Sequence, residues 1–138
     1  MEETLLVIKP DAVRSGHIGD IVSRLEQAGF RITGMVMRQL QRAEAEEFYT
    51  VHRGKDFFSG LVDFIISGPV VAVRVSGDDV RRRLRDFVGA TDPAKALPGT
   101  IRRDFGTSVR MNAVHAANPD EDVERELNFF FPAVEAKK

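Results

Sequence analysis

Hydrophobic positions along the chain fall into two patterns that predict an alternation of strands and helices. Four segments form apolar or loosely alternating runs, which are typical of strands: residues 4–8, 30–39, 70–75 and 111–115. Three segments carry apolar side chains at helical spacing and end near a glycine: residues 18–25, 58–65 and 80–88. The run at residues 4–8 has no helical gaps, so we expect a central strand that is buried on both faces.

The last helix carries the clearest boundary signals. Asn118 is a favourable N-cap, and Pro119 suits the first helical position. The acidic residues 120–122 would complement the positive end of the helix dipole, and the apolar face would run from Val123 to Phe130. The succession of elements predicts an α+β fold in which helices pack on one face of a mostly antiparallel sheet.

The composition is that of a soluble globular chain, with 43% hydrophobic and 30% charged residues. For 138 residues we expect a single domain over residues 1–138. No apolar run approaches the roughly 20 residues that a membrane helix needs. The N-terminus lacks the cationic region of a secretory signal, and the chain has no cysteine. These features predict a cytoplasmic protein with no membrane partner and no thiolate chemistry.

The net charge of −1 conceals one basic segment. Residues 81–110 hold eight Lys or Arg and three Asp or Glu, a net charge of +5, which favours a polyanionic partner. The alternative for Arg81, Arg82 and Arg83 is a solvated helix face that binds nothing.

His115 closes the last strand-like run and lies just before the last helix. A neutral imidazole is both a nucleophile and a good leaving group near neutral pH, so this histidine is a candidate for covalent catalysis. A packed and hydrogen-bonded structural histidine is the alternative that the position alone leaves open.

Glu126 falls on or beside the inward face of the last helix, where a carboxylate is costly unless it is paired. Because the helix begins soon after His115, Glu126 can return to the imidazole. It would then fix the tautomer and leave the other ring nitrogen ready to attack. A surface salt bridge with Arg125 or Arg102 is an equally good interpretation of the spacing.

Polar side chains suited to phosphate lie near the ends of the predicted elements: Lys9, Arg85, Thr91, Arg102 and Asn112. Lys9 ends the first strand because Pro10 cannot continue a ladder, and simple solvent exposure is the alternative for this lysine. The sequence has no glycine-rich phosphate loop and no His/Cys cluster with zinc spacing. Phosphate would therefore be held by side chains.

Six short motifs stand in the order and at the spacing of a known family: Ile-Lys-Pro-Asp-Ala-Val (8–13), Phe-Phe-Ser-Gly-Leu-Val (57–62), Ser-Gly-Pro-Val-Val-Ala (67–72), Gly-Ala-Thr-Asp-Pro (89–93), Pro-Gly-Thr-Ile-Arg (98–102) and Asn-Ala-Val-His (112–115). Through them the chain resembles the nucleoside diphosphate kinases essentially from end to end. The resemblance implies a ferredoxin-like α/β sandwich with a four-stranded antiparallel sheet covered by helices. It also implies ping-pong transfer of the γ-phosphate from a nucleoside triphosphate to a nucleoside diphosphate.

The resemblance also implies catalytic roles by motif position. His115 corresponds to the phosphorylated nucleophile, and Glu126 corresponds to the carboxylate that orients it. Lys9, Tyr49 and Asn112 resemble the groups around the sugar 3′-hydroxyl and the transferred phosphoryl group.

The remaining implications concern the nucleotide, the metal and the assembly. Arg85, Thr91 and Arg102 resemble the side chains that bind the β- and γ-phosphates, and Phe57 resembles the ring that stacks on the base. Mg²⁺ would bridge the phosphates and be held mainly by the nucleotide and water, with no metal ligands from the protein. The family implies a homo-oligomer, either a hexamer or a tetramer, with residues 90–99 used in subunit packing.

The chain departs from the family directly after the histidine. Where the usual motif is His-Gly/Ala-Ser-Asp-Ser, this sequence has His115, Ala116, Ala117, Asn118 and Pro119. Ala117 removes a hydroxyl that, by resemblance, lies near the imidazole and the glutamate, at a cost of ~1–3 kcal/mol. We therefore expect a slower enzyme rather than an inactive one.

Two other functions stay open. A degenerate homologue that binds nucleotides or acts as a scaffold is motivated by the altered residues 117–119. A nucleic-acid-binding module is motivated by the basic segment. The net charge of −1, the single Tyr and the absence of Trp make that second interpretation the weaker one.

Overall fold

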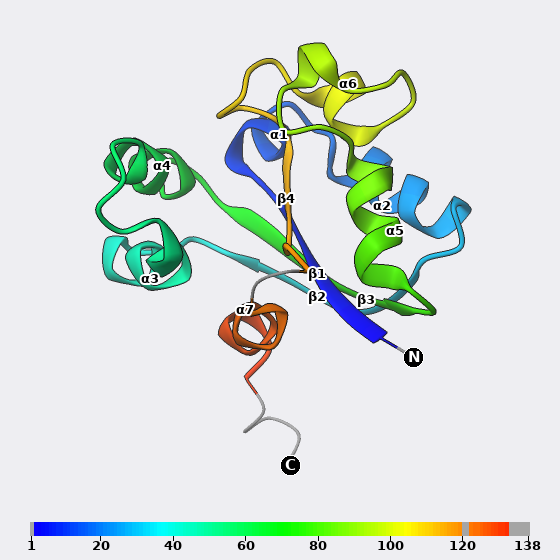
Figure 1. Cartoon of the computed structure of the whole chain (residues 1–138), viewed down its shortest axis with the longest axis horizontal. Coiled ribbons are helices and arrows are strands. Elements are labelled where there is room, and N and C mark those ends of the chain that lie inside the picture. The colour runs from blue at the N-terminus through cyan, green and yellow to red at the C-terminus, as the bar shows by residue number, and fades with distance from the viewer. Residues whose placement is uncertain (1, 120–121, 133–138) are drawn as a thin grey trace.

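The computed structural model describes residues 2–119 and 122–132, and Figure 1 shows their arrangement. In chain order the helices and strands are β1 (Glu2–Ile8), α1 (Pro10–Arg14), α2 (Ile18–Gln27), β2 (Arg31–Arg38), α3 (Arg42–Phe48), α4 (Phe58–Ile65), β3 (Val70–Gly77), α5 (Val80–Val88), α6 (Ile101–Phe105), β4 (Val114–Ala116) and α7 (Val123–Phe130). Short 3-10 helices lie at Thr50–His52 and Pro93–Lys95. No helix formed by the described residues is long and apolar enough to cross a membrane.

The four strands form one antiparallel sheet in the order β2-β3-β1-β4. β1 lies in the interior, paired with β3 along its whole length and with β4 at its C-terminal end. Val7 therefore stands opposite Ala72 on one side and opposite His115 on the other. The side chains from Leu5 to Ile8 are at most 1% exposed, so the predicted central strand is confirmed.

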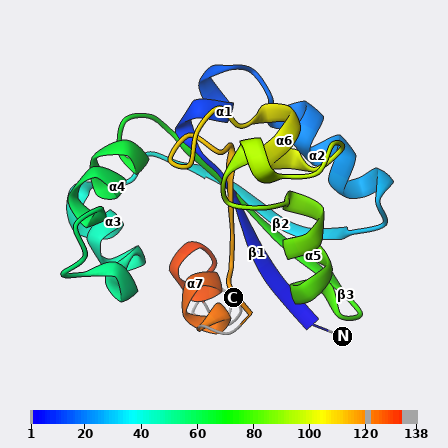
Figure 2. The same ribbon diagram turned by 45° about the horizontal axis from the view of Figure 1, so that its top comes forward.

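Helices cover both faces of this sheet. Leu6 and Ile8 pack in one cluster with buried residues of α1, α2, α5 and α6, whereas Leu5 and Val7 pack in a second cluster with residues of α3, α4 and α7. Figure 2 shows α3, α4 and α7 on one side of the strands and α2, α5 and α6 on the other. The expectation that helices pack on one face is wrong, because β1 and β3 are apolar on both faces and each face must be covered.

The last helix begins later than predicted. α7 starts at Val123, and its N-cap is Asp122, whose Oδ1 accepts a hydrogen bond from the amide of Arg125 at 2.9 Å. Asn118 and Pro119 precede the helix, so the prediction that they cap and open it is wrong.

The path of the chain explains this shift. Asn and Asp are equally good caps, so side-chain preference does not choose between them. The amide of Ala117 still donates to the carbonyl oxygen of Leu5 at 3.0 Å. The chain therefore follows the edge of β1 to this point and cannot yet turn into a helix. Residues 120 and 121, also predicted for the first turn, lie outside the described residues.

Three short helices carry too few apolar positions to be predicted from periodicity, namely α1, α3 and α6. α1 has Pro10 at its first position, where the missing amide proton costs nothing. α3 is preceded by Gln41, whose backbone amide donates to Oε1 of Glu44 at 2.9 Å. The Thr100 hydroxyl caps α6 by accepting from the amide of Arg103.

Candidate active site

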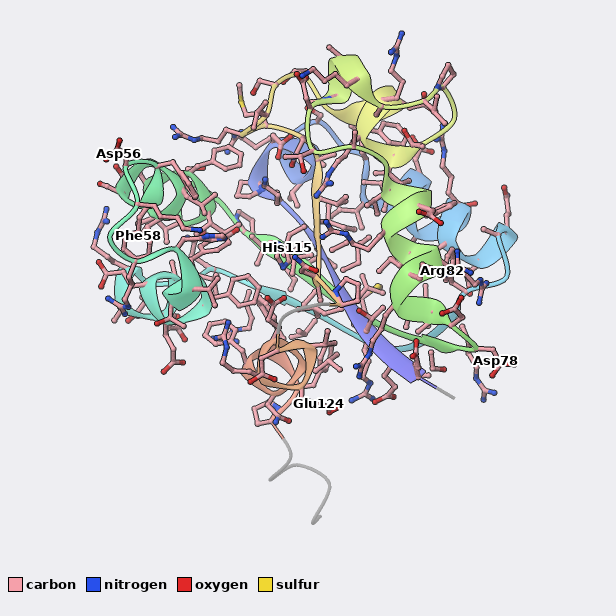
Figure 3. The ribbon with its side chains drawn as sticks, in the orientation of Figure 1. Asp56, Phe58, Asp78, Arg82, His115 and Glu124 are labelled. Carbon is pink, nitrogen blue, oxygen red and sulfur yellow. The ribbon has the colours of Figure 1, made fainter. Side chains whose placement is uncertain are left out.

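A cleft of about 570 Å³ is lined by residues that follow β1 and α3 and by residues of α4, α5, α6 and β4. Eight of the side chains predicted for catalysis or nucleotide binding line it together: Lys9, Tyr49, Phe57, Arg85, Thr91, Arg102, Asn112 and His115. In Figure 3 His115 lies near the centre of the molecule, whereas Asp56, Asp78 and Glu124 lie at its periphery. The fold thus gathers side chains that are dispersed over a hundred residues of sequence.

β4 presents His115 to this cleft, and α7 brings Glu126 back behind it. Nε2 of His115 lies 2.8 Å from Oε1 of Glu126, whose side chain is 6% exposed. An ionised Glu126 accepts the Nε2 proton, which leaves the lone pair on Nδ1. Arg125 and Arg102 instead donate to backbone carbonyl oxygens, so the alternative of a salt bridge between Glu126 and either arginine is wrong.

The end of α3 supplies an aromatic wall beside the imidazole. The rings of Phe48 and Tyr49 meet His115 edge-on, with centroids 5.3 and 6.2 Å from the imidazole. Burial, aided by the charge of Glu126, raises the pKa of Tyr49, so its hydroxyl stays protonated and can donate. Arg125 donates to two carbonyl oxygens at the end of α3, at 3.2 and 3.1 Å, and this fixes α7 against that wall.

Arg85 and Arg102, two of the three arginines that line the cleft, form no ion pair with a carboxylate among the described residues. Nη1 and Nη2 of Arg102 donate to the carbonyl oxygens of Gly89 and Val114, both at 3.0 Å. Arg85 donates to the carbonyl oxygen of Ala116 at 3.2 Å. Burial, and then the charge of Arg85, lower the pKa of Arg102 to about 10, so it stays charged at neutral pH. Both guanidinium groups are therefore oriented without being neutralised.

Lys9 is only 5% exposed, so the alternative of a solvent-exposed lysine is wrong. Its Nζ donates to Oδ1 of Asn112 at 2.8 Å, and Nδ2 of Asn112 donates to the carbonyl oxygen of Thr91 at 2.9 Å. Burial lowers the pKa of Lys9 to about 8, and the charge of Asp11 opposes this shift. The ammonium group is thus a buried cation at neutral pH, held by a neutral amide.

The part of the cleft around Phe57 has a different character. Phe57 is 46% exposed, the ring of His52 lies 5.2 Å away, and the ammonium of Lys55 lies 5.7 Å from the ring centroid. Leu61 and Val109 line the same cleft. An exposed ring with apolar neighbours offers a surface on which a nucleobase can stack.

Some lining residues were not identified by sequence analysis, among them His52, Leu61, Val109 and Arg110. Arg110 packs so closely on α4 that a Cβ at Gly60 would lie 2.6 Å from its Nη2, so a larger residue there would displace the guanidinium group. His52 ends a 3-10 helix, and Val109 and Arg110 lie in a loop, where no periodicity marks them. Leu61 lies in the predicted helix α4, but its spacing did not indicate that it would face the cleft. Their closeness in sequence to Phe57 and Asn112 was the available signal.

The site is suited to anionic oxygen atoms. None of the described residues that line it is Asp or Glu. The described part of the chain also has no group of three or more His, Cys, Asp or Glu side chains placed to hold a metal ion. The cleft offers guanidinium, ammonium, amide and hydroxyl donors, which match phosphate oxygens.

Comparison with known proteins points in the same direction. Residues 2–136 match the sequence profile of a family described as Nucleoside diphosphate kinase. The nucleoside diphosphate kinases of Desulforamulus reducens and Chlamydia abortus are each 50% identical over 135 residues; these cover 98% of this chain and 91% and 96% of those proteins. The crystal structure of the Aquifex aeolicus nucleoside diphosphate kinase superposes with a TM-score of 0.93 at 42% identity, over 97% of both chains. The structure of the Halobacterium salinarum nucleoside diphosphate kinase in complex with CDP superposes with a TM-score of 0.91 at 43% identity, over 95% of this chain and 88% of that chain.

Proposed function

The chain belongs to the nucleoside diphosphate kinase family and is a nucleoside diphosphate kinase, and we propose that it transfers the γ-phosphate through a phosphorylated His115. The donor is a nucleoside triphosphate and the acceptor is a nucleoside diphosphate. The observation that carries the role of His115 is its 2.8 Å contact with Glu126 inside a cleft lined by cations. No observation favours a degenerate homologue that only binds nucleotides or acts as a scaffold.

The proposed chemistry has two half-reactions. Nδ1 of His115 attacks the γ-phosphorus, and the bond from that phosphorus to the β–γ bridging oxygen breaks as the nitrogen–phosphorus bond forms. The nucleoside diphosphate leaves, and a terminal β-phosphate oxygen of a second diphosphate then attacks the phosphorus and restores the imidazole. Glu126 fixes the tautomer and stabilises the positive charge that develops on the ring.

Phosphoryl transfer depends mainly on positioning and charge neutralisation. Arg85 and Arg102 supply fixed cations for the β- and γ-phosphates, and the Thr91 hydroxyl adds a neutral donor. These groups need no reorganisation on binding, because backbone carbonyl oxygens already orient the two guanidinium groups.

The sugar and the base have their own partners in this proposal. Lys9, Tyr49 and Asn112 contact the 3′-hydroxyl and the transferred phosphoryl group. Phe57 stacks on the base, and because every base has a π-face, the enzyme accepts all of them.

A divalent cation is consistent with a kinase of this family, and we assign Mg²⁺ to this role. The ion would neutralise and orient the phosphates, held by phosphate oxygens and water rather than by a protein cage. The cleft fits this arrangement, since the described residues that line it are cationic or neutral and leave the metal coordination to the nucleotide.

We also propose a cytoplasmic homo-oligomer, either a hexamer or a tetramer. β2 is an edge strand, and its Met35 and Met37 are 52% and 56% exposed. Leu97, in the loop that the family uses for subunit packing, is 74% exposed. Such edges and apolar side chains favour association. Light scattering should give a mass well above 15.4 kDa, and a clean monomer would contradict the assembly.

Steady-state kinetics test the proposed mechanism. Initial rates at varied ATP and dTDP concentrations should give parallel double-reciprocal lines, because the first product leaves before the second substrate binds. His115→Ala should abolish turnover. His17→Ala is the matched control, since His17 packs on Phe105 outside the cleft. Intersecting lines would mean that both substrates bind before a product leaves, and would contradict the ping-pong pathway.

A further inference from the structure

Ala113 adopts a backbone conformation that residues other than glycine rarely adopt. Its φ is 77°, and among the described residues Asp79 is the other non-glycine with a positive φ. Alanine has no polar side-chain group that could stabilise this left-handed turn, and Ala113 is 0% exposed. Neighbouring groups must therefore hold the turn that leads into β4.

Two hydrogen bonds hold Ala113, one through its backbone amide and one through its backbone carbonyl oxygen. Its amide donates to Oδ2 of Asp11 at 3.0 Å, and its carbonyl oxygen accepts from the amide of Lys9 at 2.9 Å. Asp11 follows Pro10, which occupies the first position of α1 and fixes the backbone there. The carboxylate is thus delivered to Ala113 by a rigid segment.

This turn sets the positions of side chains before and after it. Asn112 bridges Nζ of Lys9 and the carbonyl oxygen of Thr91, at 2.8 and 2.9 Å. His115 follows in β4, whose pairing with β1 begins at Val114 opposite Ile8. A change in φ at the turn would rotate Asn112 relative to His115.

The charge of Asp11 serves a second purpose. A neutral amide oxygen would satisfy the Ala113 amide equally well, so that hydrogen bond alone does not require a carboxylate. The second oxygen of Asp11, Oδ1, is buried and has no hydrogen-bond partner among the described residues. The charged groups that face the Lys9 ammonium are Asp11, Arg102 and Arg110. Of these, Asp11 favours the protonated lysine and the two arginines disfavour it.

We infer that Asp11 is a positioning residue for phosphoryl transfer, which aligns Asn112 with His115 through the Ala113 turn and places a negative charge beside Lys9. This inference rests on the proposed function of His115. An acidic residue that only stabilised the first turn of α1 would account neither for the bond to Ala113 nor for the buried second oxygen.

Four variants separate the two contributions. Asp11→Asn keeps an oxygen acceptor for the Ala113 amide and removes the charge, whereas Asp11→Ala removes both. Ala113→Gly relieves the strain of the turn, and the double variant Asp11→Ala/Ala113→Gly tests for rescue. Asp20→Ala is the matched control, because Asp20 is an exposed acid in the first turn of α2.

The readout is the single-turnover rate of His115 phosphorylation by ATP as a function of pH. The rate should be constant over a plateau and then fall at alkaline pH, along the alkaline limb of the profile. Asp11→Asn should keep the plateau rate within about twofold of wild type and shift the alkaline limb to lower pH. Asp11→Ala should show the same shift and a plateau about tenfold lower, because the turn loses its support. Adding Ala113→Gly should recover part of the plateau without restoring the alkaline limb.

The outcomes distinguish this inference from the proposed function. A wild-type protein that is not phosphorylated on His115 defeats the proposed function, whatever the variants do. If the wild type is phosphorylated, an unshifted limb in Asp11→Asn overturns the inference, and so does an unchanged plateau in folded Asp11→Ala. Should Asp11→Ala fail to fold, the alkaline limb of Asp11→Asn alone decides.

Discussion

Arg82 and Arg85 lie on the same helix of the basic segment 81–110 but have different partners, and Arg102 has surroundings like those of Arg85. On the outer face of α5, Arg82 forms ion pairs with Asp79 and Asp86 and is 68% exposed. Figure 3 shows Arg82 on the side of α5 that faces away from His115. Arg85, on the same helix, and Arg102 reach the cleft and donate to backbone carbonyl oxygens instead.

The difference shows what a phosphate site requires. A carboxylate neutralises the cation that it binds, whereas a carbonyl oxygen orients the cation and leaves most of its charge. Binding of a polyanion needs cations that are both oriented and not neutralised. The solvated-face interpretation therefore describes Arg82, whereas Arg85 and Arg102 have the surroundings expected of phosphate ligands.

Removal of a cleft arginine should give the largest loss of nucleotide affinity. Arg102→Ala and Arg85→Ala each delete a charge-assisted bond to phosphate, worth ~1.5–3 kcal/mol, without unfolding the domain. Arg82→Ala is the matched control and should change affinity by less than about 0.5 kcal/mol. Calorimetric titration with ADP and Mg²⁺ measures all three. Equal losses in Arg82→Ala and Arg85→Ala would mean that the partners of an arginine do not decide whether it binds phosphate.

The part of the cleft around Phe57 should contribute affinity without selecting a base. Phe57→Ala should weaken every nucleotide by a similar ~1–3 kcal/mol, because stacking has little base preference. The same titration with purine and pyrimidine diphosphates checks this. A loss confined to one class of base would mean that Phe57 reads the base rather than supports it.

Ala117→Ser tests the support of the nucleophile separately from the phosphate ligands. Ala117 is 1% exposed beside β4, and restoring the family's hydroxyl should raise the rate of the chemical step by about tenfold. Nucleotide affinity should stay constant, because the substitution does not touch the arginines. A single-turnover rate that is unchanged in the folded variant would mean that the pair of His115 and Glu126 already has compensation from elsewhere.

The smallest expected effect is the change of nucleotide affinity and stability with pH, which depends first on Lys9. In the folded protein the pKa of Lys9 is lowered to about 8 from 10.5, so its cation is lost as pH rises through about 8. Nucleotide affinity should therefore fall as the pH rises above that value. Between about 8 and 10.5 the unfolded chain binds more protons than the folded one, so the free energy of unfolding should rise with pH. Titrations and denaturant melts at graded pH would reveal opposite trends, and parallel trends would contradict them.

The hydrophobic pattern could predict the long elements and part of β4, but not the short helices α1 and α3. β1, α2, α4 and α5 follow from apolar runs and stripes, because burial dictates those positions. α1 and α3 depend on capping and on tertiary contacts, and the start of α7 depends on where the chain leaves β1. These are long-range constraints that periodicity does not record.

The sequence could predict which residues form the candidate site, but not which of them contact one another. Spacing alone left Glu126 equally suited to a surface salt bridge and to His115, and the structure places it against the imidazole. The position of His52 and Arg110 along the cleft could not be predicted, because a short 3-10 helix and a loop carry them there. The Ala113 turn and its bond to Asp11 join residues 102 positions apart in sequence, beyond the reach of any local pattern.

The most direct test of the central claim is the intact mass of the protein after incubation with ATP and Mg²⁺. We expect one added phosphoryl group per chain, stable in alkali, labile in acid, mapped to His115 and absent from His115→Ala. The adduct should disappear when a nucleoside diphosphate is added. Labelling that survives His115→Ala, or that maps to Ser or Thr, would contradict the account.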